Sequence, residues 1–197
     1  MRREDLHELH YITPISNVPS MLSRGILSHR RVTKVQHESV AMQEIQERRA
    51  KVTVPGGRAL HDYVNLYISA RNPMLYLRRG HHESLCVVQI GTEVLDLDGV
   101  VIADRNASSD YCLFGPAPSA LINVNGDLVF AEYWTHPGNV IEEWEHKSIK
   151  CAEVLVPDRL PPEFIRSAYV SCDVGKGRLA AVAPGLAVTI NGHLFFR

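Results

Sequence analysis

The sequence predicts an α+β domain with a largely antiparallel sheet. Short runs rich in β-branched and apolar residues dominate the second half of the chain, and regular helices do not alternate with them. Parallel strands need a crossover connection, usually a helix, so this pattern disfavours a doubly wound parallel sheet. No repeat, low-complexity tract or linker divides residues 1–197, which we interpret as a single domain.

The N-terminal elements follow from local signals. Residues 10–13 are predicted to form a short strand. Asn17 is the expected N-cap of a helix that continues to Arg24, with Pro19 in its first turn. Gly25 is the expected stop of this helix, because glycine is favoured just past a helix C-terminus.

A second helix is predicted from about Ser39 to Arg49. Its spacing places Val40, Ile45 and Met42 on the inward face. The helix ends in a basic cluster at residues 48–51, and a glycine-containing loop follows at residues 54–57.

The remaining elements are strands. The C-terminal runs 186–190 and 194–196 flank Asn191-Gly192, which predicts a type I′ hairpin. Further strands are predicted at 66–68, 85–90, 94–97, 100–103, 152–156 and 168–171.

Composition describes an ordinary soluble chain of 197 residues with a net charge of −1. No run of about 18 apolar residues exists, and residues 1–9 carry charges of both signs, so we expect no membrane span and no secretory signal. The four cysteines are widely spaced, which suits reduced thiols in the cytoplasm.

Residues 1–79 carry 13 Lys/Arg against 7 Asp/Glu, whereas residues 80–197 carry 8 against 15. The basic first half is compatible with a polyanion-binding face, although the charges can also intermingle on folding.

Common catalytic signatures are missing from the sequence. Neither GxxxxGK[ST] nor a GxGxxG after a strand occurs, and no GxSxG elbow is present. There is no HExxH, and the neighbours His81 and His82 would point to opposite faces of a strand, so we expect no metal.

Individual residues have ordinary explanations. Glu153 lies between apolar residues of a predicted strand, where it is either surface-facing or a fixed carboxylate that stabilises positive charge on a sugar ring. Arg49 can be a solvated residue at a helix end, and Arg71 can be a surface charge beside a turn. His10 and Tyr67 are explained as core residues.

Taken together, the segments resemble the DarT-type DNA ADP-ribosyltransferase toxins of the ADP-ribosyltransferase superfamily. The ordered motifs span about residues 9 to 173, which makes the resemblance more specific than any single motif. They are Leu9–Thr13, Asn17, Gly25–Leu27, Ser39, Ile45–Arg49, Leu60–Tyr67, Arg71–Tyr76, Tyr133–Trp134 and Ala152–Val156.

The resemblance implies a split, twisted antiparallel sheet that binds NAD in a central cleft. By this resemblance Glu153 is the catalytic glutamate, and Arg49 assists catalysis by contacting the NAD phosphates or helping to deprotonate the acceptor. His10 would hold an NAD ribose, and Tyr67 would stack on the nicotinamide ring. The remaining expected NAD-binding positions are Tyr11, Ile12, Thr13 and Asn17.

The resemblance also implies partners. Arg71 and Met74 match positions on the DNA side, and residues 119–150 would form the loop that selects the base, with Trp134 stacking on it. The acceptor would be guanine or thymine in single-stranded DNA, because residues 65–68 and 71–74 depart from the pattern usual for thymine. The chain would be the toxin of a toxin–antitoxin pair, opposed by an ADP-ribosyl hydrolase of the macrodomain or NADAR type.

Two alternatives remain at this stage. The first is an ADP-ribosyltransferase that acts on RNA or protein. The second is a nucleic-acid-binding module without catalytic activity. The presence of His10, Arg49 and Glu153 favours catalysis over the second alternative.

Overall fold

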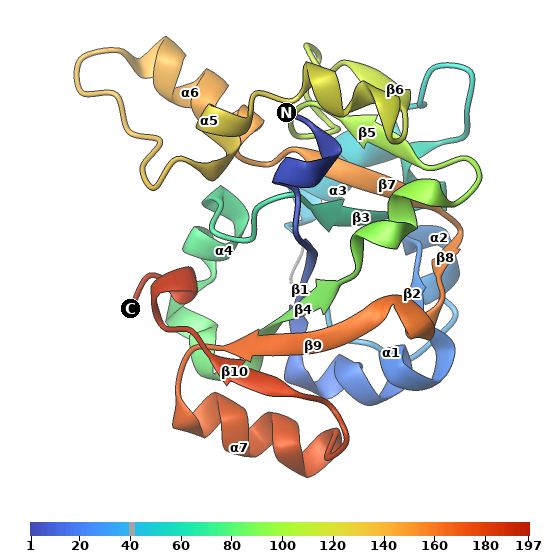
Figure 1. The fold of residues 1–197 in the computed structure, drawn as a ribbon, viewed down its shortest axis with the longest axis vertical. Helices are drawn as coiled ribbons and strands as arrows, with labels where there is room; N and C mark the ends of the chain where they lie inside the picture. Colours follow the sequence, from blue (N-terminus) through green and yellow to red (C-terminus); the bar gives the residue numbers. More distant parts are fainter. Residues whose placement is uncertain (40–41) are drawn as a thin grey trace.

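The computed structural model describes residues 1–39 and 42–197 (Figure 1). They build an eight-stranded sheet in the order β10-β9-β4-β1-β3-β7-β5-β6, beside a small pair of β2 and β8. Neighbouring strands of the large sheet run antiparallel except β9 and β10, which are parallel. The mixed fold with a mostly antiparallel sheet, predicted from the sequence, is therefore confirmed.

The elements of this fold are short. The strands are β1 (Leu9–Pro14), β2 (Ile26–Leu27), β3 (Tyr63–Tyr67), β4 (Leu85–Ile90), β5 (Val101–Ala103), β6 (Phe114–Pro116), β7 (Glu153–Pro157), β8 (Arg159–Leu160), β9 (Ile165–Val170) and β10 (Val188–Ile190). The α-helices are α1 (Val18–Arg24), α2 (His29–Val32), α3 (Gln43–Ala50), α4 (Pro73–Leu77), α5 (Gly126–Phe130), α6 (Val140–Ile149) and α7 (Asp173–Val182). Within the described ranges, no helix has the length and apolarity needed to cross a membrane.

The two faces of the sheet differ in chemistry. One face is apolar: Leu66, Val88 and Val154 are buried in the main core together with Met21 of α1 and Leu179 of α7. Because side chains alternate along a strand, the residues between these project to the other face. That face carries a polar row in which Ser167, Gln89, His10, Tyr67 and Glu153 are cross-strand neighbours on five successive strands.

The sheet is split between β1 and β3. These two strands pair only at His10 and Tyr67, among the residues that the structure describes. By contrast, β1 pairs with β4 along its whole length, and so does β3 with β7. The backbones of β1 and β3 therefore diverge beyond His10, which opens a space between the two halves of the sheet.

The predicted first helix is confirmed as α1, but its capping is not. Gly25 ends the helix with a φ of 80°, and a Cβ at this position would lie 2.1 Å from the carbonyl oxygen of Leu160. Glycine is thus required both by the left-handed backbone and by the approach of β8. Asn17 occupies the predicted N-cap position, but it has helical dihedrals and its side chain makes no capping hydrogen bond.

The second predicted helix is shorter and differently buried than expected. The observed α3 covers Gln43–Ala50, and Val40 lies outside the described residues. Met42 is 41% exposed, so its predicted inward orientation is wrong, and Ile45 is half-buried. The buried residue of this helix is instead Arg49.

Two predicted strands are 3-10 turns. Residues 92–96 form a turn that buries the successive residues Val94 and Leu95, which an alternating strand would not do. The C-terminal hairpin is also wrong, because the Asn191 side chain accepts a hydrogen bond from the Leu194 N–H (3.0 Å) and bends residues 193–195 into a turn. The strand before it, β10, pairs in parallel with β9 after the α7 crossover (Figure 1).

Candidate active site

A cavity of about 580 Å³ lies where β1 and β3 diverge. This volume is within the range of pockets that hold cofactors and small molecules. Its walls come from β1, β3, α2, α3 and a loop at residues 106–111. The expected NAD-binding residues Tyr11, Ile12, Thr13, Asn17 and Tyr67 all line this cavity.

Arg49, near the end of α3, lines the cavity and forms an ion pair with the buried Glu153. The Arg49 guanidinium donates to both Glu153 carboxylate oxygens, Nη1 to Oε1 at 2.9 Å and Nη2 to Oε2 at 3.0 Å. The two residues are 104 positions apart and are 7% and 1% exposed. Glu153 is therefore not a surface-facing strand residue, and Arg49 is not a solvated helix end.

A loop after β5 also holds Glu153. The Ala107 N–H donates to Glu153 Oε1 at 3.1 Å. Asp104 and Asn106 fix this loop, because the Asp104 carboxylate accepts from the Leu113 N–H (2.8 Å) and the Asn106 N–H donates to the Ser148 carbonyl (2.9 Å). Three donors thus orient a desolvated carboxylate, the arrangement that electrostatic catalysis requires.

The charges of this site are well defined. Burial opposes the charge of Arg49, but the attraction of Glu153 outweighs it and the pKa of Arg49 is raised. Burial and the negative charge of Glu153 raise the pKa of the neighbouring Tyr67 well above its usual value. The cavity wall therefore presents a charged arginine and a neutral phenol.

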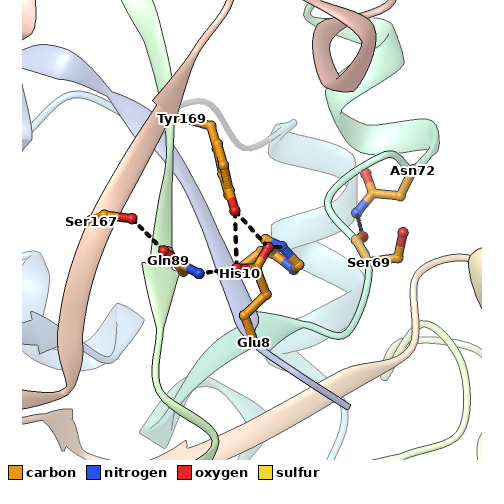
Figure 2. A network of polar contacts seen from close by, with 7 residues as sticks. All are labelled: Glu8, His10, Ser69, Asn72, Gln89, Ser167 and Tyr169. Atoms are coloured by element: carbon orange, nitrogen blue, oxygen red, sulfur yellow. Dashed lines mark hydrogen bonds and ion pairs between the residues drawn. The ribbon is translucent and has the colours of Figure 1, made fainter. Parts of the chain in front are cut away.

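The structure does not bring His10 into the cavity. Figure 2 shows its ring beside Glu8, where Nε2 lies 2.8 Å from Oε1. Glu8 also accepts hydrogen bonds from the Tyr169 hydroxyl (3.0 and 3.1 Å) and the Gln89 amide. His10 Nδ1 is buried without a partner. His10 thus belongs to the polar row, one strand away from the cavity residues of β3.

Asn17 has a role that the sequence did not indicate. Its side-chain amide donates to the Glu38 carbonyl (2.8 Å) and accepts from the Glu38 N–H (3.0 Å). It also donates to the Thr13 hydroxyl (3.2 Å). Asn17 therefore ties the segment at Glu38 to β1 beside the cavity.

Two of the expected DNA-side residues, Arg71 and Trp134, belong to an aromatic cluster, which we define as Tyr76, Trp134 and Phe196 with Arg71 over the Phe196 ring. Trp134 is 7% exposed, and its ring meets Tyr76 and Phe196 edge-on at 5.8 Å. The Arg71 guanidinium lies 4.1 Å from the Phe196 ring centroid and donates to the His193 carbonyl (2.6 Å). Trp134 and Arg71 thus fasten the α5–α6 connection and the C-terminus, whereas Met74 lines the cavity.

Sequence analysis missed several buried polar residues near these sites. Lys150 is 1% exposed, and its Nζ donates to the carbonyls of Val129 (2.8 Å) and Ala131 (2.7 Å) at the end of α5. Burial, with the nearby charge of Arg71, lowers the pKa of Lys150 to about 8. His29 and His61, which stack in the cavity wall, were also missed. No local pattern marks such residues, because their partners lie far away in the sequence.

Comparison with known families decides the family of this fold. The model of the family described as "ssDNA thymidine ADP-ribosyltransferase, DarT" matches residues 10–194. The chain belongs to the DarT family. Its similarity extends to a DNA ADP-ribosyl transferase of Thermus sp., which is 30% identical over 82% of this chain and 80% of that protein.

A second DarT-family relative is a fusion protein of Thermosipho africanus that joins a DNA ADP-ribosyl transferase to a DNA ADP-ribosyl glycohydrolase. It is 34% identical over 83% of this chain, which spans 42% of its length. The structure of Thermosipho africanus DarTG with ADP-ribose matches 96% of this chain and 51% of that chain, with a TM-score of 0.81 and 29% identity. The Thermus DarT structure with ADP-ribosylated ssDNA has the same fold, with a TM-score of 0.83 at 24% identity and 96% coverage of both chains.

Proposed function

We propose that this DarT-family chain transfers ADP-ribose from NAD⁺ to a nucleobase of single-stranded DNA. The observation that carries the proposal is the buried ion pair of Glu153 with Arg49, a residue that lines the split-sheet cavity. An ion pair removed from water costs free energy, so its retention beside a cavity suits a chemical task better than stability. The relatives named DNA ADP-ribosyl transferases support the assignment.

Glu153 acts on the sugar. Its carboxylate accepts a hydrogen bond from the 2′-hydroxyl of the nicotinamide ribose and stabilises the positive charge that develops on the ring as the glycosidic bond breaks. The bonding electrons leave with nicotinamide, and a base nitrogen supplies the pair for the new bond to C1′. The nitrogen loses its proton, so the products are nicotinamide, the modified base and H⁺. Arg49 keeps Glu153 oriented throughout, because it donates to both carboxylate oxygens.

The cavity walls orient the dinucleotide. The backbone of Tyr11 and Ile12, on the side of β1 that diverges from β3, holds the nicotinamide amide. Tyr67 stacks on the ring as a neutral phenol. Thr13 lines the same wall. His10 supports the site as the cross-strand neighbour of Tyr67. Its buried Nδ1 has no partner, and a ribose hydroxyl that reached this atom would supply the missing hydrogen bond.

DNA lies against α4, where Met74 meets the cavity and Arg71 adds positive charge. Guanine or thymine is the acceptor. Residues 1–197 act as one catalytic domain in the cytoplasm, which suits the unpaired thiols at Cys86, Cys112, Cys151 and Cys172. The partner is a hydrolase antitoxin of the macrodomain or NADAR type, as the fused glycohydrolase of the Thermosipho relative suggests.

The test is mass spectrometry of mixed-sequence single-stranded oligonucleotides after incubation with the protein and NAD⁺. We expect an ADP-ribose adduct, whose fragmentation names the base. Glu153→Gln should abolish the adduct, whereas Glu163→Gln, a matched change at an exposed glutamate, should preserve it. Adducts on RNA or protein alone, or unconsumed NAD⁺ in the presence of DNA, would contradict the proposal.

A further inference from the structure

Two histidines from different elements stack against each other in the cavity wall. His29 opens α2, and His61 lies in the 3-10 turn Leu60–Asp62. Their ring centroids are 4.1 Å apart with an interplanar angle of 38°, and both rings line the cavity. His61 Nε2 is buried and has no hydrogen-bond partner. A buried polar atom without a partner costs free energy unless a ligand completes it.

The surroundings of this stack are mainly cationic. The positive charge of Arg49 in α3 disfavours protonation of both rings, and that of His37, which follows α2, disfavours protonation of His29. His37 also lines the cavity, with its Nδ1 2.9 Å from the Val35 carbonyl. The negative charge of Asp62 opposes these cations at His61, and Asp62 is itself paired with Arg30 at 2.8 Å. The cations that act on the two rings outnumber Asp62, so an anion is attracted to the stack, while Glu38 and Asp110 line other parts of the same cavity.

The same surroundings keep the stack uncharged without a ligand. Burial lowers the pKa of His29, and the charges of His37 and Arg49 lower it further. Burial also lowers the pKa of His61, with His29 and Arg49 acting in the same direction. Burial and the nearby positive charges disfavour the imidazolium form of both rings, and a bound anion would favour it.

The covalent structure of NAD⁺ identifies its diphosphate as the anion for this stack. In NAD⁺ the diphosphate is attached to C5′ of the ribose whose 2′-hydroxyl we assign to Glu153. Arg49 forms an ion pair with Glu153, its charge also reaches both histidines, and the side chains of Arg49 and the two histidines line one cavity. The diphosphate therefore lies close to Arg49, in the direction of the stack.

We propose that the His29–His61 stack binds the diphosphate of NAD⁺ and takes up a proton from solvent as the dinucleotide binds. The inference rests on the proposed function. An imidazole becomes an imidazolium, no covalent bond of the ligand changes, and the diphosphate stays fully ionised. The close stacking admits one such proton, because two imidazolium rings at this distance repel each other.

The experiment is isothermal titration calorimetry with carba-NAD⁺, an analogue that resists cleavage, in two buffers of different ionisation enthalpy at about pH 6.5, near the ordinary pKa of histidine. Proton uptake makes the observed heat depend on the buffer. We expect net uptake of a fraction of a proton for the unmodified protein and for His7→Gln, a change at an exposed histidine. His61→Gln should bind more weakly and lose the buffer dependence.

Different failures have different meanings. Binding with the same heat in both buffers would overturn this inference and leave the proposed function intact. Uptake that persists in both His61→Gln and His29→Gln would overturn it as well, because the proton would then reside elsewhere, as on His37. No binding of carba-NAD⁺ to the folded, unmodified protein would contradict the NAD site itself. If His61→Gln unfolds, His29→Gln alone supplies the comparison.

Discussion

The cavity beside the Arg49–Glu153 pair and the aromatic cluster differ in how their side chains are held: by charge in the first and by ring packing in the second. In the cavity, two residues 104 positions apart meet as a buried ion pair, with Glu153 held by three donors. In the aromatic cluster, Arg71 and Trp134, which were expected to contact DNA, both pack against Phe196, and Trp134 is buried.

This difference separates two kinds of site residue. A carboxylate needed by a reaction can be desolvated and still act, since burial strengthens its electrostatic effect on a bound substrate. A tryptophan that stacks on bases must be free to do so. The buried Trp134 is therefore unavailable for stacking on a base, whereas its neighbour Tyr133, which is 68% exposed, is accessible.

The largest expected effect comes from separating the ion pair. Arg49→Ala leaves Glu153 buried without its charge partner, which we expect to lower the free energy of unfolding by about 3–5 kcal/mol. Activity should fall by at least about 100-fold, the scale set by losing one electrostatic contact to a transition state. Urea unfolding and the oligonucleotide assay measure the two effects.

A double replacement separates stability from catalysis at this pair. Arg49→Met with Glu153→Leu removes both charges together, so most of the lost stability should return while activity stays absent. A double variant no more stable than Arg49→Ala would mean that the pair holds the fold together, and the contrast with the aromatic cluster would then disappear.

At the aromatic cluster we expect an effect on stability instead. Trp134→Ala should cost roughly 3 kcal/mol, because it empties a packed space beside Tyr76 and Phe196. Tyr133→Ala should change stability by less than about 0.5 kcal/mol and weaken oligonucleotide binding. The reverse result, with Trp134→Ala stable and defective only in DNA binding, would make Trp134 a stacking residue after all.

Lys150 gives a pH-dependent test of the same region. Its folded-state pKa of about 8 lies below its usual value, so between pH 8 and about 10.5 the unfolded chain binds more protons. Stability should therefore rise with pH across this window, on the order of 2 kcal/mol relative to Lys150→Met. The neutral amine still donates to both carbonyls. Parallel stability profiles for the two proteins would contradict a charged, desolvated Lys150.

The smallest effect is expected at Glu8, which contacts His10 and Gln89 of the polar row. Burial would raise the pKa of Glu8, but the hydrogen bond and charge of His10 outweigh it and the pKa is lowered. Its stabilising contribution is therefore present above the unfolded pKa of about 4.3 and is lost as pH falls through the folded value. Glu8→Gln should cost about 1 kcal/mol at pH 7 and converge with the unmodified protein near pH 3. A constant difference across this range would contradict the sign.

Much of the fold was predictable because its signals are local. The helix at α1 needed only Pro19 and Gly25, and β4 and β9 needed only their β-branched runs. The failed predictions depended on contacts. Where a hairpin was expected, the Asn191 side chain accepts a hydrogen bond from the Leu194 N–H and a 3-10 turn forms. Where a strand was expected, a 3-10 turn buries both Val94 and Leu95.

For the site, the sequence alone supplied residue types and a family resemblance. The resemblance pointed to Arg49 and Glu153, whose roles as catalytic residues stay predictions, and the structure placed them in one ion pair. It also pointed to His10 and Trp134, which the structure places beside the cavity and inside the aromatic cluster. The His29–His61 stack had no sequence signal, since one ring comes from α2 and the other from the distant 3-10 turn Leu60–Asp62.

The sequence by itself determined the class of fold, the ordered motifs of the DarT family and the residue types on which the chemistry depends. Only the tertiary structure decided which of those residues are buried, which are paired and which face the cavity. The physical reason is that desolvation and pairing arise between segments as far apart as α3 and β7. Local patterns of polarity record where a strand or helix forms, but not which distant side chain removes a charge from water.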